Sequence, residues 1–375
     1  MGSVGTLTFH HVGNYGAILQ AYALQQTLVD MGHDVEVIDY QPNWANGSEG
    51  SLFRRMGRPV IRGARKILGV TGEERQRRTE QFRHENLRLS STRYLDRVTL
   101  HREPPVYDAY ITGSDQVWNP KIQRNDSSYF LTFAPPGKKR ISYAASFGIS
   151  SLPDRFVSEY RDWLGQLHCV STREFEGKRI IEQISGRDAQ VTLDPTLLLD
   201  GEQWSQIAAP YVHKRPYILY YCIWGDRLMT SSSIRIARQV STLTGWDIIS
   251  VGGRPEMKLV LWRNCVPNAG PSEFVGLFQN ASFVVTDSFH GTAFAINYER
   301  PFAVIANLSL PPEQARSSRI TTLLKMLGIE NRLVPAGVQS VGRELIELDY
   351  RKGQSLLQGE RQRSIRFLRD ALEGA

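Results

Sequence analysis

The sequence predicts an α/β protein built from two doubly wound, Rossmann-like domains. Short apolar segments alternate with amphipathic segments of helical period, and several of the apolar segments end in glycine-rich or polar turns. A length of 375 residues allows two domains of roughly 100–200 residues, each with its own core. The hydrophobic fraction of 41% and the charged fraction of 22% are ordinary globular values, which excludes a chain that is disordered throughout.

The first domain is expected within residues 1–200. It begins with an apolar segment at Val4–Phe9, a glycine-rich loop, a helix at Tyr15–Met31 and a second alternating segment at Val35–Tyr40. This strand–loop–helix–strand order predicts parallel strands joined by a right-handed crossover. Further strands are expected at Ala109–Thr112, Arg140–Ala145 and His168–Ser171, with a helix at Ser158–Leu167.

The second domain is expected within residues 201–350, after a strand around Val191 that runs into Pro195 and a polar connection at His213–Pro216. Residues 351–375 are expected to form an amphipathic helix, centred on Gln354–Leu372, that packs across the domains. The second domain is predicted to contain strands at Tyr217–Cys222, Trp246–Val251, Phe283–Thr286 and Phe302–Ile305, and helices at Ser232–Thr242, Ser272–Phe278, Gly291–Asn297 and Ser318–Leu327.

The cysteines indicate a reducing compartment. Cys169, Cys222 and Cys265 are far apart and odd in number, and none belongs to a close Cys/His pair of the kind that zinc sites use. No apolar run approaches the roughly 20 residues that span a bilayer, and the N-terminus begins as a strand instead of a signal peptide. We therefore expect a cytoplasmic protein without a metal site.

A basic segment at residues 51–102 holds fourteen Lys and Arg residues against five acids, a surplus that exceeds the net charge of +7 for the whole chain. Aromatic residues are not interleaved through its basic core, and no DNA- or RNA-binding motif accompanies it, so we expect no nucleic-acid partner. An anionic membrane surface at the inner face, a phosphate-bearing substrate and a solvated helical insertion all remain compatible with this pattern.

The first candidate ligand site is the turn between the first strand and helix, Gly13-Asn14-Tyr15-Gly16-Ala17. Glycines let the backbone approach a ligand closely, and the free amides at a helix start can bind an anion. The turn lacks the third glycine of a dinucleotide fingerprint and the Lys-Thr pair of a P-loop. A purely structural tight turn is the alternative.

A second polar cluster follows the strand Ala109–Thr112, at the end where open α/β sheets present ligand groups. Carboxylate and amide groups beside an indole can bind the hydroxyls and the ring face of a sugar, whereas a capped loop with a buried indole is the alternative. The cluster comprises Ser114, Asp115, Gln116, Trp118 and Asn119. Farther along, Arg173 follows another strand and could bind a carboxylate or phosphate, or form a salt bridge with a nearby acid.

The most informative segment begins with the apolar strand Phe283–Thr286. Asp287, Ser288 and His290 follow this strand directly, and Gly291-Thr292 then opens a helix whose free amides face the same place. This arrangement predicts anion binding beside an imidazole that can donate a proton near neutral pH. In the first turn of a later helix, Arg319 is either a second anion ligand or a surface charge.

Together these motifs resemble the polysaccharide pyruvyl transferase family from residue 13 to about residue 320. Each motif alone has low specificity, but the agreement of six in one order is hard to obtain by chance. The motifs are Gly13–Ala17 with Leu19-Gln20-Ala21-Tyr22-Ala23-Leu24, Gly113–Asn119, Ser142–Gly148, Arg173-Glu174, Asp194-Pro195-Thr196 and Asp287–Thr292.

The resemblance implies a glycosyltransferase-B-like fold with the active site between its two domains. Members of the family transfer pyruvate from phosphoenolpyruvate, as a ketal, onto two hydroxyls of a saccharide or lipid-linked saccharide in the biosynthesis of exopolysaccharides and cell-wall polymers. This chemistry requires no cofactor, nucleotide or metal. Under this resemblance, His290 is expected to be the acid or a phosphate ligand, and Asp115 is expected to bind the acceptor sugar or to act as the base. The resemblance further suggests donor binding by Arg173, Arg319, Asp287, Ser288, Gly291 and Thr292, and acceptor binding by Asn14, Tyr15, Gly16, Ser114, Gln116, Trp118 and Asn119.

One position departs from the family pattern. Many members carry an arginine two positions before the motif histidine, where this chain has Ser288. Either Arg319 or another arginine supplies the missing charge, or the donor differs. A nucleotide-sugar glycosyltransferase of the same fold and a non-catalytic glycan-binding protein are the alternative functions.

Overall fold

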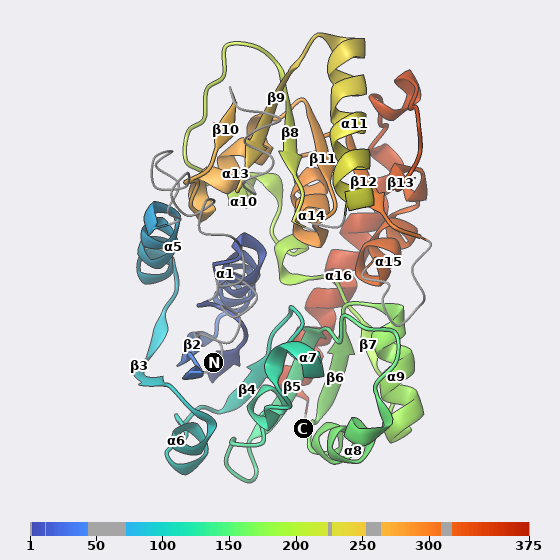
Figure 1. Cartoon of the computed structure of the whole chain (residues 1–375). Helices are drawn as coiled ribbons and strands as arrows, with labels where there is room; N and C mark the ends of the chain where they lie inside the picture. Colours follow the sequence, from blue (N-terminus) through green and yellow to red (C-terminus); the bar gives the residue numbers. More distant parts are fainter. Residues whose placement is uncertain are drawn as a thin grey trace, which may run out of the picture.

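The chain folds into two α/β halves, each built on a parallel sheet (Figure 1). This computed structural model describes residues 2–11, 13–43, 73–223, 227–252, 264–308 and 317–374. All strand pairings between named strands in these ranges are parallel. The predicted fold class of two doubly wound α/β units is therefore confirmed.

The first sheet has seven strands within the described ranges, in the order β3-β2-β1-β4-β5-β6-β7. The order changes direction between β1 and β4, and ligands of open α/β sheets bind beyond the carboxyl ends of strands at such a point. The strands are β1 (Ser3–Leu7), β2 (Asp34–Tyr40), β3 (Leu89–Tyr94), β4 (Ala109–Thr112), β5 (Lys139–Ala145), β6 (Cys169–Thr172) and β7 (Gln190–Val191).

The helices of the first half begin at well-defined caps. The side chain of Asn14 caps α1 by accepting a hydrogen bond from the amide of Gly16, and Asp96 caps α6 through the amide of Thr99. The helices are α1 (Tyr15–Asp30), α5 (Glu73–Asn86), α6 (Arg97–Arg102), α7 (Pro120–Gln123), α8 (Val157–Gly165) and α9 (Phe175–Ser185).

The second sheet has six strands in the described ranges, in the order β10-β9-β8-β11-β12-β13. These strands are β8 (Tyr217–Tyr221), β9 (Asp247–Val251), β10 (Cys265–Val266), β11 (Phe283–Thr286), β12 (Phe302–Ala306) and β13 (Leu333–Pro335). The helices are α10 (Gly201–Ser205), α11 (Arg227–Thr244), α13 (Pro271–Asn280), α14 (Phe289–Asn297), α15 (Ser318–Leu327) and α16 (Arg351–Glu373).

Strand β8 shows why the central strands are apolar at every position. Ile218 and Tyr220 belong to the core that includes residues of α11, whereas Leu219 and Tyr221 belong to the core that includes residues of α13 and α14. Because helices cover both faces, side chains that point in opposite directions are all buried.

The structure corrects the prediction of a helical insertion at residues 51–102, of which 51–72 lie outside the described residues. Helices α5 and α6 flank a strand, β3, which forms the edge of the first sheet and pairs with β2. Its sequence, Leu-Ser-Ser-Thr-Arg-Tyr, has only two large apolar residues, as expected for a strand at a half-solvated edge. The sparse pattern explains why the strand was not predicted.

Several arginines of residues 51–102 form ion pairs with acids inside the protein. Arg83 contacts Asp39 (3.1 Å), Arg93 contacts the same carboxylate (2.9 Å), and Arg78 contacts Glu273 of the second half (2.6 Å). These acids lie outside residues 51–102, so the segment neutralises charges elsewhere in the molecule. Contact with an anionic membrane stays a prediction.

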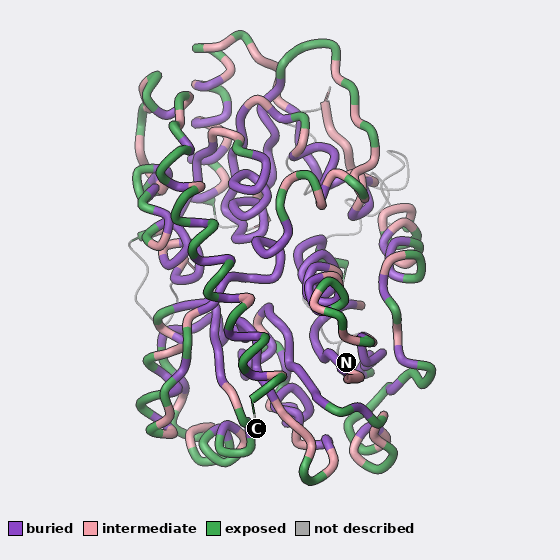
Figure 2. The backbone as a smooth tube through the Cα atoms, turned by 180° about the vertical axis from the view of Figure 1, so that it is seen from behind, coloured by how far each residue is buried: buried purple, intermediate pink, exposed green. Residues whose placement is uncertain are grey.

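Helix α16 connects the two halves along the back of the molecule (Figure 2). Its first turns contact the second half, where Tyr350 Oη donates to Arg300 O (2.7 Å), and its last turns contact β5 through Lys139, which donates to Leu372 O (2.6 Å). Between them, Ser364 Oγ accepts from the amide of Leu193 (3.0 Å). Every helix in the described part of the chain is too short or too polar to cross a bilayer.

Candidate active site

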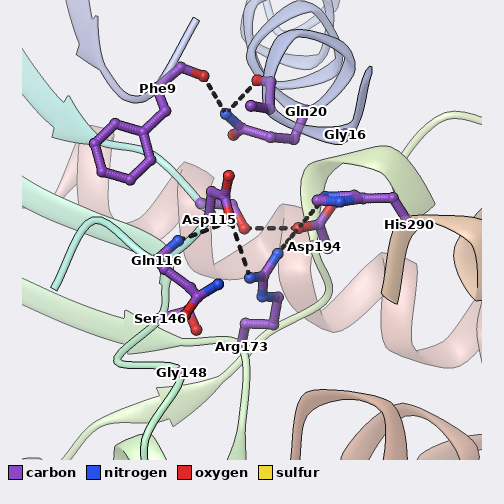
Figure 3. Close-up of polar contacts among 12 residues, drawn as sticks. Phe9, Gly16, Gln20, Asp115, Gln116, Ser146, Gly148, Arg173, Asp194 and His290 are labelled. Carbon is purple, nitrogen blue, oxygen red and sulfur yellow. Dashed lines mark hydrogen bonds and ion pairs between the residues drawn. The ribbon is translucent and has the colours of Figure 1, made fainter. Parts of the chain in front are cut away.

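Polar side chains from both halves meet where the chain crosses from the first half to the second. Asp194 lies at the start of this crossing, at the N-cap of a 3₁₀ turn, Pro195–Leu197. Arg173 follows β6, Asp115 follows β4, and His290 lies in the first turn of α14. Figure 3 shows these four side chains converging.

Asp194 is the centre of this cluster and is fully buried. Its Oδ1 accepts from the amide (2.9 Å) and the hydroxyl (2.6 Å) of Thr196, and its Oδ2 accepts from Ser114 Oγ (2.7 Å) and Arg173 Nη1 (2.6 Å). Burial alone would raise the pKa of Asp194, but the charges of His290 and Arg173 outweigh burial and hold this pKa well below its usual range. Asp194 is therefore an ionised anchor for residues of both halves.

His290 reaches the cluster from the second half. Helix α14 begins two residues earlier than predicted, because Ser288 adopts an extended conformation and its hydroxyl caps the amide of Gly291 (3.4 Å). This places His290 Nε2 3.7 Å from Asp194 Oδ2, close enough for an ion pair but too far for a hydrogen bond. His290 Nε2 is buried and has no hydrogen-bond partner among the described residues.

Gly16 makes room for this imidazole. A methyl group at Gly16 would overlap the ring atoms of His290, so only glycine allows α1 of the first half to approach so closely. Gly16, in the turn predicted to bind the acceptor, and His290, the predicted acid, therefore lie in direct contact.

Two buried arginines of the cluster have N–H groups without a hydrogen-bond partner in the described ranges. Arg173 is buried; its Nε and Nη2 have no hydrogen-bond partner in the described part of the chain, and its guanidinium lies 4.5 Å from the ring centre of Phe289. Arg319, in the first turn of α15, is also buried, and its Nε has no hydrogen-bond partner there. Burial and the charge of Arg173 lower the pKa of Arg319 to about 10.

Glu174 is an acid of the cluster to which the sequence analysis gave no role. It is fully buried; its Oε1 accepts from Ser146 Oγ (2.8 Å) and from the amides of Phe147 (3.0 Å) and Gly148 (3.2 Å), whereas Oε2 has no hydrogen-bond partner among the described residues. Burial raises the pKa of Glu174, although the charges of Arg173 and Arg319 oppose this shift.

Four predicted donor ligands shape the start of α14. Asp287 Oδ1 accepts from the amide of Ile223 (2.7 Å), and Thr292 Oγ1 donates to Ser288 O (3.0 Å). Gly291 packs on Thr286 with no room for a side chain. Together with the Ser288 cap, these contacts hold His290 in place; direct contact with a donor stays a prediction for all four.

On the acceptor side, Asp115 and Gln116 lie beside the cluster. Asp115 has φ 74° and is 3.6 Å from Arg173 Nη2, and its Oδ1 accepts from the amide of Gln116 (2.9 Å). Asn119 donates to Gln116 Oε1 (2.9 Å) and caps α7, while Asn14 caps α1. The capping contacts orient these groups, and their contact with an acceptor stays a prediction.

The structure corrects three predicted acceptor contacts. Trp118 is fully buried, is stacked on Phe130 and donates its indole N–H to Tyr129 O (3.0 Å). Ser114 is fully buried and acts on the site through Asp194.

Tyr15 is the third correction. Its ring stacks on Phe274 of the second half (4.5 Å), and its hydroxyl donates to Ala269 O (2.7 Å). Burial raises its pKa to about 12, so the hydroxyl keeps its proton. Tyr15 therefore binds the two halves together.

Within the described residues, no group of three or more His, Cys, Asp or Glu side chains is placed to hold a metal ion. The guanidinium and imidazole groups of the cluster can bind an anion, and the carboxylates beside them can transfer a proton.

Comparison with protein families decides the identity of the chain. The model of the family described as polysaccharide pyruvyl transferase matches residues 14–309, a span that includes His290 and Arg173. The chain belongs to the polysaccharide pyruvyl transferase family. Arg319 lies beyond the matched segment. A comparison with curated proteins found no match.

Solved structures similar to this polysaccharide pyruvyl transferase family member share its fold at low sequence identity. A Listeria monocytogenes protein assigned as a UDP-N-acetylglucosamine 2-epimerase has a TM-score of 0.53 at 10% identity, over 98% of this chain and 90% of that chain. UDP-N-acetylglucosamine 2-epimerase from Rickettsia bellii has a TM-score of 0.50 at 12% identity, over 100% and 97%. The predicted two-domain, glycosyltransferase-B-like architecture is confirmed, and these similarities extend to the fold alone.

Proposed function

We propose that this protein transfers pyruvate from phosphoenolpyruvate to a saccharide, forming a ketal. The observation that carries the proposal is the set of buried donors without partners: Arg173 Nε and Nη2, Arg319 Nε and His290 Nε2. A buried donor without a partner costs roughly 1–3 kcal/mol, and more if charged, so several in one place imply an absent acceptor-rich ligand. Phosphoenolpyruvate carries a phosphate and a carboxylate, both rich in acceptors.

The charges of the cluster support an anionic donor. Arg173 and Arg319 are close enough for each guanidinium charge to disfavour the other, and neither side chain is open to solvent. A bound dianion would relieve this repulsion through charge-assisted hydrogen bonds. Arg319 thereby offers the positive charge that Ser288, an uncharged residue whose hydroxyl caps α14, cannot supply.

In this proposal, His290 Nε2–H protonates C3 of the enolpyruvyl group. Its proton is not committed to Asp194, because 3.7 Å is too long for a hydrogen bond. The cation that develops at C2 is then attacked by an acceptor hydroxyl, and Asp115 is placed to take the hydroxyl proton.

Calorimetric titration with phosphoenolpyruvate tests the proposal. We expect the wild type to bind phosphoenolpyruvate and the Arg173→Met variant to bind it at least about 100-fold more weakly, a loss of about 2.7 kcal/mol. Arg332→Met is the matched control, because Arg332 is equally buried but donates to Leu345 O (2.8 Å) far along the second half. Binding of a uridine diphosphate sugar without binding of phosphoenolpyruvate would instead assign the protein to the nucleotide-sugar glycosyltransferases.

A further inference from the structure

Gln20 is a fully buried amide that the steps above do not use. Its Nε2 donates to Thr8 Oγ1 (2.8 Å), Ala17 O (2.8 Å) and Phe9 O (3.4 Å). Main-chain carbonyl oxygens can only accept, so the amide cannot be turned over without placing an oxygen against two other oxygens. The orientation of Gln20 is therefore fixed.

The other end of this amide has no partner. Gln20 Oε1 is buried and accepts no hydrogen bond from any described residue. Leaving a buried acceptor unsatisfied costs roughly 1–3 kcal/mol, so the atom requires a donor that the protein itself does not provide.

Two connections place this oxygen beside the candidate active site. Thr8 Oγ1, which accepts from Gln20, itself donates to Ser114 O (2.8 Å), the residue before Asp115. Gly16, which contacts His290, lies one turn before Gln20 on the same face of α1. In Figure 3 the Gln20 oxygen is directed toward the Asp115 carboxylate.

The chemical class of the missing ligands follows from the unpartnered atoms of the site, which include several donors and the acceptor Gln20 Oε1. The ionised donor, phosphoenolpyruvate, carries only acceptors, which suit Arg173, Arg319 and His290 but leave Gln20 Oε1 unsatisfied. A hydroxyl group is a donor and satisfies Gln20. Within the described residues, Asp115 Oδ1 accepts from the amide of Gln116, whereas its Oδ2 accepts no protein hydrogen bond, so a second hydroxyl can bind there.

We propose that Gln20 Oε1 and the Asp115 carboxylate form the subsite for the two acceptor hydroxyls that become the ketal oxygens. This inference rests on the proposed function. Gln20 orients one hydroxyl and cannot take its proton, because a neutral amide oxygen is a very weak base. Asp115 orients the other hydroxyl and can accept a proton. The subsite therefore selects saccharides whose two hydroxyls lie close enough to span the two side chains.

The reaction balances with these roles. The bond between C2 and the bridging phosphate oxygen breaks, and two bonds form between C2 and the acceptor oxygens. The acceptor loses two hydroxyl protons in all: the methyl group at C3 gains one in the net reaction, and the departing phosphate gains the other. No oxidant, reductant or further reactant is needed.

Saturation-transfer NMR with methyl glycosides of glucose, galactose, mannose and N-acetylglucosamine tests the subsite, with inorganic phosphate present to occupy the donor side. We expect the wild type to bind at least one glycoside, and Gln20→Met to bind that glycoside at least about tenfold more weakly, a loss of about 1.4 kcal/mol. The affinity for phosphoenolpyruvate, measured separately, should change by less than about twofold, since Gln20 donates nothing to the donor.

Gln25→Met is the matched control on the same helix. Gln25 is buried, and it bonds to Asn86 O (3.0 Å) and the amide of Arg88 (2.7 Å), away from the site. Its loss should leave glycoside binding unchanged. If Gln20→Met does not fold, Asp115→Asn provides the second test, because asparagine tolerates φ 74°; this variant should also weaken glycoside binding.

Three outcomes would overturn the inference. These are equal glycoside affinity of wild type and Gln20→Met, absence of glycoside binding by the wild type at millimolar concentration, and a parallel loss of phosphoenolpyruvate and glycoside affinity in Gln20→Met. Failure of the proposed function is recognised separately, since it is the wild type that would then fail to bind phosphoenolpyruvate.

Discussion

Two buried carboxylates of this protein, Asp39 and Asp194, both contact arginines but differ in what surrounds them. Asp39, at the end of β2, accepts from His10 (3.0 Å), Gln41 (2.6 Å), Arg83 (3.1 Å) and Arg93 (2.9 Å). Arg83 directs its remaining donors to Glu80 (3.0 and 2.8 Å). The Asp39, Arg83 and His10 side chains thus leave no buried atom unpartnered in the described structure.

In the network of Asp194, both carboxylate oxygens accept hydrogen bonds, but Arg173 has nitrogens without a hydrogen-bond partner in the described part of the molecule. Arg173 gives one nitrogen to Asp194 and keeps two without partners, and Arg319 and His290 each add one more. The comparison teaches that a buried ion pair by itself does not mark a functional site. The Asp194 cluster differs because several unpartnered donors, on Arg173, Arg319 and His290, lie together, and such a group can bind a ligand rich in acceptors.

The largest expected effect is on stability, from breaking the saturated network. Arg83→Met should lower the free energy of unfolding by about 3–5 kcal/mol, because it leaves Asp39 buried with one cation fewer and Glu80 without its partner. Denaturant unfolding followed by circular dichroism measures this loss. Arg77→Met is the control on the same helix: its pair with Glu74 is exposed and screened by solvent, so its loss should lower the free energy of unfolding far less than the loss of Arg83. Equal losses in the two variants would contradict the comparison.

The second expected effect is a loss of ligand affinity in the Asp194 cluster without a comparable loss of stability. Arg319→Met should weaken binding of phosphoenolpyruvate by about 100-fold, or about 2.7 kcal/mol, while the free energy of unfolding stays within about 1 kcal/mol of the wild type or rises. The reason is that Arg319 is buried near the like charge of Arg173 and has an unpartnered nitrogen. Calorimetry and denaturant unfolding of one preparation give both values. A stability loss as large as that of Arg83→Met would show that Arg319 is structural.

The smallest expected effect is an opposite pH dependence of two isosteric variants, Asp39→Asn and Glu174→Gln. Burial opposes ionisation of Asp39, but hydrogen bonds from His10, Gln41 and Arg93 lower its pKa, so its ionised form stabilises the fold above about pH 4 and this contribution is lost as the pH falls. Burial raises the pKa of Glu174, so its contribution is lost as the pH rises above about 4.3.

Unfolding is therefore measured from about pH 2 to pH 8, because the Asp39 contribution changes below about pH 4 and the Glu174 contribution changes above about pH 4.3. The cost of Asp39→Asn should shrink as the pH falls below about 4 and stay constant above it, whereas Glu174→Gln should gain stability relative to the wild type as the pH rises above about 4.3. Curves of both variants that stay parallel to the wild type would contradict the assigned directions.

Much of the fold could be predicted from sequence because the central strands are apolar on both faces. The segments at Val4, Val35, Tyr217 and Phe283 all proved to belong to strands. The unpredicted strands lie at sheet edges and are short or poor in apolar residues: β3 has few apolar residues, β10 has two residues and β13 has three. In such strands, pairing with a neighbour determines the structure, and the local pattern carries little information.

The site was predicted in part for a related reason. His290, Arg173, Arg319 and Asp115 follow strands or begin helices, where local patterns point to ligand groups. Glu174, Asp194 and Gln20 were given no role, because their importance depends on contacts that the chain makes over long separations, such as Ser114 with Asp194. Tyr15 and Trp118 failed as acceptor contacts for the opposite reason: their polar atoms are satisfied inside the core.

Gly16 of the first half and His290 of the second half are in contact, so the sizes of these two residues limit how closely the two halves can approach each other. A bulkier residue at position 16 would hold the halves apart, and a smaller one at position 290 would restore their approach. Gly16→Ala combined with His290→Ser should therefore regain the packing of wild type while lacking its proton donor. The cost of a larger residue at position 16 should therefore depend on the size of the residue at position 290.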